Sequence, residues 1–194
     1  CLVGSEMCIR DSLYLGIESG LDDVLKFMKK DHDLAQAYQA IDRLHEAGLI
    51  YDAHIMTGVA GKGRGMENAE ALAQFLNRTN PAHVVNFSMF LHKEVPLYQD
   101  IRQGTFVPAD ELETIREEYH LIERIAPEKA GANILYDGFH DFIHVRVRGH
   151  LPGDKEKMLA KLNGIIQEYE GKEPVYSFVP VSYTHLRAHE TGRN

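Results

Sequence analysis

Three short apolar segments of the sequence contain side chains that could bind a ligand or move a proton. Glu18 closes the segment 13–17, and His54 and Asn86 each lie within a later segment. A carboxylate accepts hydrogen bonds from hydroxyl groups, histidine exchanges protons near neutral pH, and an asparagine amide both donates and accepts. We therefore expect these three side chains to face one common site.

The first segment has the alternation of a β-strand. One row of positions is apolar and consists of Leu13, Leu15 and Ile17. The other row consists of Tyr14, Gly16 and Glu18 and so ends in the carboxylate. Ser19 and Gly20 end the strand, and the acidic start of 21–28 predicts a helix. A strand that ends in a polar residue before a turn and a helix is a usual place for chemistry in α/β proteins.

Two further segments repeat this arrangement. In 49–58 and 83–92, apolar residues alternate with polar ones. Helices are predicted at 34–47, with Asp33 as the N-cap, and at 66–77. Strands that alternate with helices of this length predict a βαβαβ unit with parallel strands and right-handed crossovers.

One row of each predicted strand is polar, whereas a parallel sheet covered on both faces would be apolar throughout. The polar rows contain Glu18, Asp52, His54, Asn86, Ser88 and His92. We expect these side chains to face a ligand-holding lumen, with Glu18, His54 and His92 at one open edge. The α/β fold predicted is therefore a partial barrel rather than a doubly wound sheet. For each histidine, a buried core role remains the alternative.

The later part of the chain is predicted to form a smaller α/β accessory segment. Residues 13–126 would form the partial barrel, and residues 127–180 the accessory segment, with strands at 133–136 and 141–149 and a helix at 155–169. A solvated face, rather than a metal site, is expected for His140, Asp141, His144 and His150, because an extended strand would spread them over roughly 20 Å.

The two flanks, 1–12 and 181–194, lack the periodicity of the middle and resemble translated sequencing-adapter sequence. We expect them to be non-native and the rest to be an internal fragment of a longer protein. Both cysteines, Cys1 and Cys8, lie in the first flank. The middle therefore contains no disulfide framework, which fits a cytoplasmic protein.

Overall composition disfavours two classes of partner. The net charge is −8 and the pI is near 5.7, so a nucleic-acid-binding surface is not expected. No apolar run approaches the roughly 18 residues of a membrane span.

The three strand–turn units resemble the second half of the core barrel of radical S-adenosylmethionine (radical SAM) enzymes. Residues 15–20 (LGIESG) resemble the fourth strand and its turn in that family, and residues 54–61 resemble the fifth strand and its glycine turn. Residues 86–90, followed by Pro96-Leu97-Tyr98, resemble the sixth strand and its exit loop. The resemblance implies the second half of a (β/α)6 partial TIM-like barrel.

The same resemblance implies a cofactor pair and a set of binding residues. Family members use a [4Fe–4S] cluster to cleave SAM and start radical chemistry, with an electron donor such as ferredoxin or flavodoxin. The cluster ligands would lie upstream of Leu13, so the fragment alone is expected to be inactive, and its substrate is unknown. The SAM-binding positions implied here are Glu18, Ser19, His54, Met56, Thr57, Gly58 and Asn86.

Other interpretations of these residues stay open. Glu18 would otherwise pair with a lumen cation or the next helix, and Met56 would be ordinary strand packing. The turn with Lys62 and Arg64 departs from the family pattern and would either hold an anion or be a solvated loop. As whole-protein alternatives, Glu18 and His54 would be the acid and base of a cluster-free lyase or aldolase, or the chain would be a non-catalytic binding module.

Overall fold

The computed structural model describes residues 12–179 of the chain. The predicted flanks lie outside the described residues, except for Ser12, which is the first residue of a strand. Three parallel strands form the predicted unit: β1 (Ser12–Glu18), β2 (Ile50–Thr57) and β3 (His83–Ser88). The α/β class and the parallel partial-barrel arrangement are therefore confirmed.

Helices connect these strands as the sequence predicts. After β1 come the short α1 (Asp22–Phe27) and then α2 (Leu34–Glu46), and β2 is followed by α3 (Gly65–Thr79). The Asp33 carboxylate accepts a hydrogen bond from Gln36 N at 2.8 Å, while the Gln36 side chain accepts one from Asp33 N. This capping box explains why α2 starts where it does.

Two more strands extend the same sheet. β5 (Ile134–His140) is parallel to β3, and β6 (Val145–Leu151) pairs antiparallel with β5 through the 3-10 turn η1 (Asp141–Ile143). The sheet order is β1-β2-β3-β5-β6. The strands after residue 127 continue the same sheet. The boundary between a partial barrel and an accessory segment at this point therefore stays a prediction.

The remaining elements follow β3 or end the described chain. They are β4 (Leu91–His92), α4 (Leu97–Gln103), α5 (Glu111–Arg124), α6 (Lys155–Tyr169) and β7 (Phe178–Val179). The expected long third strand ends at Ser88, and β4 pairs with β7 in a separate two-stranded sheet.

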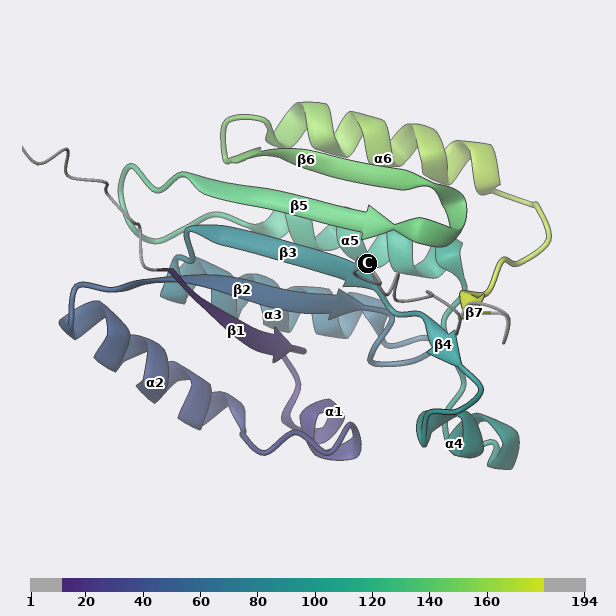
Figure 1. Cartoon of the computed structure of the whole chain (residues 1–194). Helices are drawn as coiled ribbons and strands as arrows, with labels where there is room; N and C mark the ends of the chain where they lie inside the picture. Colours follow the sequence, from purple (N-terminus) through teal and green to yellow (C-terminus); the bar gives the residue numbers. More distant parts are fainter. Residues whose placement is uncertain (1–11, 180–194) are drawn as a thin grey trace, which may run out of the picture.

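The five-stranded sheet has one covered face and one open face (Figure 1). Helices α3 and α5 lie behind the sheet in this view, and the near side of the strands has no helix in front of its centre. The main core fills the covered side, with Tyr51, Ile55, Leu72 and Tyr136 at most 1% exposed. No helix of the described residues is both long and apolar enough to cross a membrane.

Candidate functional site

Glu18 lies on the open face, at the carboxyl end of β1. Its backbone has a φ of 63°, and the pairing with β2 shifts between Gly16 and Glu18. This irregularity folds the carboxylate back over Gly16, where an added Cβ would lie 2.9 Å from Glu18 Oε1. Lys30 Nζ donates to the same oxygen at 2.8 Å. The sequence prediction for the face of Glu18 is thus confirmed, and glycine at position 16 makes its conformation possible.

His54 and Met56 lie on the same face of the neighbouring strand. Gly16 pairs with His54 in register, and the His54 ring lies between Tyr14 and Phe87, with centroid distances of 5.2 and 6.2 Å. Both His54 and Met56 are partly buried. The imidazole is thus placed among aromatic rings one strand away from Glu18.

His92, which we expected at the same edge, is not there. It belongs to β4, outside the main sheet, and its Nδ1 accepts a hydrogen bond from Glu94 N at 3.2 Å. The expectation is wrong because β3 ends at Ser88, so the alternation of the sheet does not extend to position 92.

Asn86 and Ser88 face the covered side, contrary to expectation. Asn86 is fully buried; its Oδ1 accepts from Thr57 N at 3.2 Å and its Nδ2 donates to Glu118 Oε1 at 3.1 Å. Phe87, 37% exposed, lies on the open face instead. The prediction failed because α5 supplies buried carboxylates, so a polar row on this strand does not mark the lumen.

Ser19 and the Thr57 side chain are also buried away from the open face. Ser19 Oγ donates to Asn68 Oδ1 at 2.6 Å, and Asn68 Nδ2 donates to Glu117 Oε1 at 2.7 Å. Thr57 is fully buried, and its Oγ1 has no partner among the described residues. Both side chains therefore contact the helix layer rather than the space above Glu18.

Gly58 starts the turn after β2. It has a φ of 82°, and its N–H donates to Glu117 Oε2 at 2.8 Å. An added Cβ would lie 2.7 Å from Thr114 Cγ2, so glycine is required by both conformation and space. The backbone of the turn is thus hydrogen-bonded to α5, on the covered side of the sheet.

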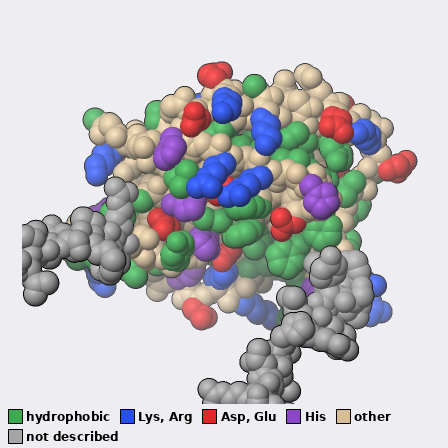
Figure 2. Space-filling view, turned by 45° about the horizontal axis from the view of Figure 1, so that its top comes forward, with side chains coloured by type: hydrophobic (Ala, Val, Ile, Leu, Met, Phe, Trp, Pro, Cys, Tyr) green, Lys and Arg blue, Asp and Glu red, His purple; other side chains and the backbone are tan. Residues whose placement is uncertain are grey.

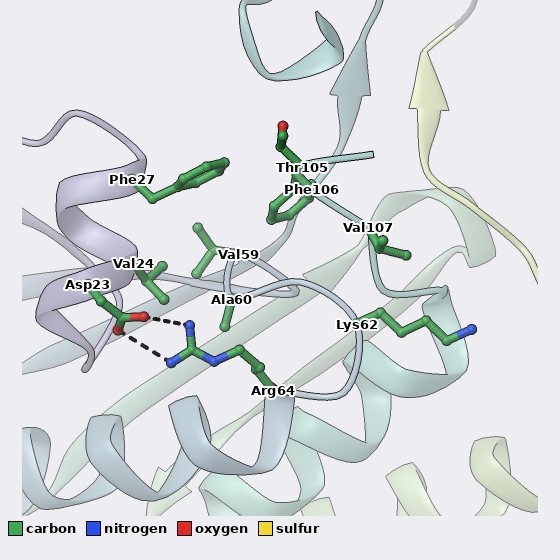
Figure 3. Close-up of a pocket in the computed structure, with 10 residues that line it drawn as sticks. All are labelled: Asp23, Val24, Phe27, Val59, Ala60, Lys62, Arg64, Thr105, Phe106 and Val107. Carbon is green, nitrogen blue, oxygen red and sulfur yellow. Dashed lines mark hydrogen bonds and ion pairs between the residues drawn. The ribbon is translucent and has the colours of Figure 1, made fainter. Parts of the chain in front are cut away.

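The turn continues along a cavity of about 360 Å³ at its outer side, shown in Figure 3. Arg64 forms two hydrogen bonds with Asp23, at 2.7 and 3.3 Å, and also pairs with Glu67. The Arg64 side chain, as hydrogen-bond donor, lowers the pKa of Asp23. Lys62 points away from Arg64. Because Asp23 and Glu67 neutralise Arg64, the turn lacks the two free cations that the anion-binding alternative required, which favours the alternative of a solvated loop.

A buried polar cluster lies between α5 and the sheet, directly behind this edge. Three carboxylates of α5, those of Glu111, Glu117 and Glu118, are at most 1% exposed. His140 of β5 is fully buried between two of them, with Nδ1 3.2 Å from Glu111 Oε2 and Nε2 2.9 Å from Glu118 Oε2. Tyr136 also donates to Glu118 Oε1, at 2.9 Å. The cluster ties α5 to the carboxyl ends of β2, β3 and β5.

The charges of this cluster depend on burial and on mutual pairing. Burial lowers the pKa of His140, but the Glu118 charge and the hydrogen bonds with both carboxylates outweigh it and raise this pKa to about 9. Burial raises the pKa of Glu117 to about 7, against the effect of the bonds from Asn68 and Gly58. His140 is therefore an imidazolium at neutral pH.

The sequence analysis missed this cluster and placed His140 on a solvated face. The other three residues of that group, Asp141, His144 and His150, are exposed as expected. A signal for the cluster was present in α5, where Glu111, Glu118 and the apolar Ile115 share a helical face. Glutamates are almost never fully buried unless they are paired. Burial of Glu111 and Glu118 could therefore be predicted only once the position of His140 was known.

We expect the stability of the chain to fall between pH 6.5 and pH 9 because of His140. Its pKa is raised from about 6.5 to about 9 on folding, so its stabilising effect is complete below the unfolded pKa and lost as pH rises through the folded one. This shift corresponds to about 3 kcal/mol of unfolding free energy. Urea unfolding at the two pH values, compared with the same pair for His140→Asn, measures it. The exposed His150→Asn is the control, and equal pH dependence in the parent and His140→Asn would contradict the assignment.

Comparison with known proteins gives a likeness of structure. No family model and no curated protein matches the sequence. Among solved structures, the chain resembles the archaeal Methanocaldococcus infernus Elp3 with an N-terminal deletion, with a TM-score of 0.58 and 19% sequence identity. The match covers 81% of this chain and 36% of the Elp3 chain. The likeness therefore shows a shared fold, and this chain spans about a third of the length of the Elp3 chain.

Proposed function

We propose that the chain is part of the core of a radical SAM enzyme, with its open face on the side that binds SAM. The observation that supports this most directly is the Glu18 carboxylate, held over Gly16 at the carboxyl end of a parallel strand. Ligands of such sheets bind beyond the carboxyl ends of the strands. The similarity of fold to Elp3 supports the same superfamily.

The chemistry of the Glu18 site suits a ligand with hydroxyl groups. Only Oε1 of Glu18 has a hydrogen-bond donor among the described residues, namely Lys30, and the side chain is 19% exposed. Oε2 is therefore available to accept hydrogen bonds from the ribose hydroxyls of SAM, as carboxylates do in dinucleotide sites. His54 and Met56, on the same face, offer apolar and aromatic surface for the adenine.

The other proposed binding residues fit SAM less directly. Gly58 would contribute backbone rather than a side chain, at the turn that Glu117 anchors. Ser19, Thr57 and Asn86 are fully buried on the covered side, where the hydrogen bonds of Ser19 and Asn86 fix the ends of β1 and β2. We propose that these three residues position the site rather than touch the ligand.

The [4Fe–4S] cluster does not fit the residues that the structure describes. Such clusters are held by cysteine thiolates, and residues 12–179 contain no cysteine. We therefore propose that the cluster ligands lie elsewhere in a longer parent protein. Bound together, SAM and the cluster would supply a carbon-centred radical that abstracts hydrogen; this chain would contribute placement of SAM and exclusion of water.

Glu18→Ala tests the proposal in a longer protein that includes the missing barrel half, reconstituted with iron and sulfide. We expect SAM affinity, measured by calorimetry, to fall about ten- to a hundredfold, because a hydrogen bond to a charged group is lost. The visible absorption of the cluster should not change, since Glu18 is not a ligand of iron. Glu156→Ala, at the start of α6, is the matched control.

Two results would contradict different parts of the proposal. Unchanged SAM affinity in Glu18→Ala would remove Glu18 from the site. A reconstituted parent that binds no cluster would remove the radical SAM assignment itself, in favour of a cluster-free enzyme or a binding module.

A further inference from the structure

A row of adjoining rings crosses the open face from strand to strand, with edge-to-face contacts at Tyr14, His54 and Phe87 and a stacked pair at Phe87 and Phe139. Tyr14 and His54 are 5.2 Å apart by ring centroids, His54 and Phe87 6.2 Å, and Phe87 and Phe139 5.5 Å. The last two rings are parallel within 16°, and the Arg146 guanidinium lies 4.7 Å from the centroid of Phe139. Each residue belongs to a different strand, from β1 to β6. The open face thus presents a continuous aromatic row that ends at an arginine.

This row is accessible rather than buried. Tyr14 is 64% and Phe87 37% exposed, and Phe139 is partly buried. Large exposed aromatic rings that adjoin one another on one face are unusual for a monomer surface, and they mark a place where something binds. Aromatic faces also stack well on other planar groups.

At the arginine end of the row, cationic side chains outnumber anionic ones. β6 places Arg146 beside Phe139 and Arg148 beside Asp137, both on the open face. Arg146 makes two hydrogen bonds with Asp137, at 2.8 and 2.6 Å. Arg148 Nε is 3.7 Å from the same carboxylate and makes no hydrogen bond within residues 12–179, while its side chain is 54% exposed. Figure 2 shows blue Lys or Arg side chains gathered beside green hydrophobic ones on one face of the molecule.

The local charge on this part of the face is positive. The Asp137 carboxylate lies beside two guanidinium groups, those of Arg146 and Arg148. The hydrogen bonds from Arg146 lower the pKa of Asp137 more than burial raises it, so Asp137 stays ionised. The other acids on this face lie farther from the arginines: Asp52 is two strands away from β5 and only 5% exposed, and Glu18, three strands away, pairs with Lys30. An anion near Arg148 would therefore meet an uncompensated positive charge in a chain whose net charge is −8.

We propose that the open face is the binding site of a planar, anionic small molecule, whose ring stacks on Phe87 and Phe139 while its anionic group pairs with Arg148. This inference rests on the proposed function, for which it names the substrate class: an aromatic or conjugated ring that carries a phosphate or carboxylate. Arginine is suited to both anions, because its planar donors match their paired oxygens.

The site requires both parts of the ligand at once. The ring alone lacks the charge contact, and the anion alone lacks the stacking surface and competes with Asp137 for the arginines. Adenosine monophosphate (AMP) and 1-naphthoate contain both parts, with phosphate and carboxylate respectively. Adenosine and inorganic phosphate each contain one part.

The experiment titrates the whole 194-residue chain with these four compounds and follows binding by NMR, including the arginine Nε–H signals. We expect AMP or 1-naphthoate to bind at least tenfold more tightly than adenosine or phosphate; which of the two binds better identifies the anion. Arg148→Gln should weaken that ligand about tenfold without changing adenosine binding. Phe87→Leu should weaken both, and Arg116→Gln, on the helix of the covered side, should weaken neither.

Several outcomes would overturn the inference. Phosphate that binds as tightly as AMP, with no effect of Phe87→Leu, would show a simple anion site. Absence of binding by all four compounds would show that Phe87, Phe139 and Arg148 form no ligand site, and a chain that sediments as a dimer disrupted by Phe87→Leu would show that a second copy covers these rings. None of these measurements involves SAM or a cluster. A negative titration with the four compounds therefore does not contradict the Glu18 proposal, and unchanged SAM affinity in Glu18→Ala does not affect the titration.

Discussion

Glu118→Leu is expected to lower the free energy of unfolding by about 3–5 kcal/mol, because it leaves a buried charge without its partner. Glu118 is fully buried, and its two oxygens meet three donors: His140 Nε2, Tyr136 Oη and Asn86 Nδ2. Leucine has a similar volume but accepts none of these bonds. Urea unfolding at neutral pH, followed by circular dichroism, measures the loss.

The design of the controls separates burial from charge. Glu123→Leu makes the same substitution on the same helix, where the side chain is 49% exposed, and should change stability by at most about 1 kcal/mol. The double variant Glu118→Leu with His140→Leu removes the stranded imidazolium as well, and it should be more stable than the single variant. A double variant that is less stable by the sum of both single losses would show that His140 and Glu118 do not act as a pair.

The sequence predicted the fold because the fold depends on local patterns. Alternation in 13–18, the Asp33 cap and the exact extent of the helix at 155–169 are all properties of neighbouring residues, and the structure confirms them. The third strand was predicted too long. Alternation continues through 83–92, whereas the sheet ends at Ser88, and where pairing stops is decided by tertiary contacts.

The candidate site was predicted less well, because the face of a polar side chain depends on what lies behind the sheet. Glu18 and His54 are on the open face, but Asn86 is on the other, where Glu118 accepts from it. Conversely, Phe87 belongs to the apolar row of 83–92, opposite the polar row expected to face the lumen, and it is exposed among the rings of the open face. Both outcomes depend on residues far away in the sequence. A carboxylate of α5 satisfies the buried Asn86 amide, and Phe87 lies beside Phe139 of β5 on the face that no helix covers.

Gly20→Ala is expected to destabilise the chain by about 3 kcal/mol through overpacking. Gly20 follows Ser19 at the end of β1, where the turn passes against α3. An added Cβ would lie 2.5 Å from Leu72 N and 2.6 Å from Ala71 C, both backbone atoms of that helix. Because backbone cannot rotate away as a side chain can, either the turn or α3 must move. Urea unfolding measures the loss.

Gly164→Ala provides a control with the opposite sign. Gly164 lies in α6, and an added Cβ there meets nothing within 4 Å, so alanine should stabilise the chain by about 0.5–1 kcal/mol. If Gly20→Ala were as harmless, the close approach of β1 to α3 would be wrong. That approach also brings Gly20 N and Ser19 Oγ within 3.1 and 2.6 Å of Asn68 Oδ1, which connects the end of β1 to Glu117 and the turn after β2. Glycine at position 20 thus allows the end of the strand that bears Glu18 to pack directly against α3.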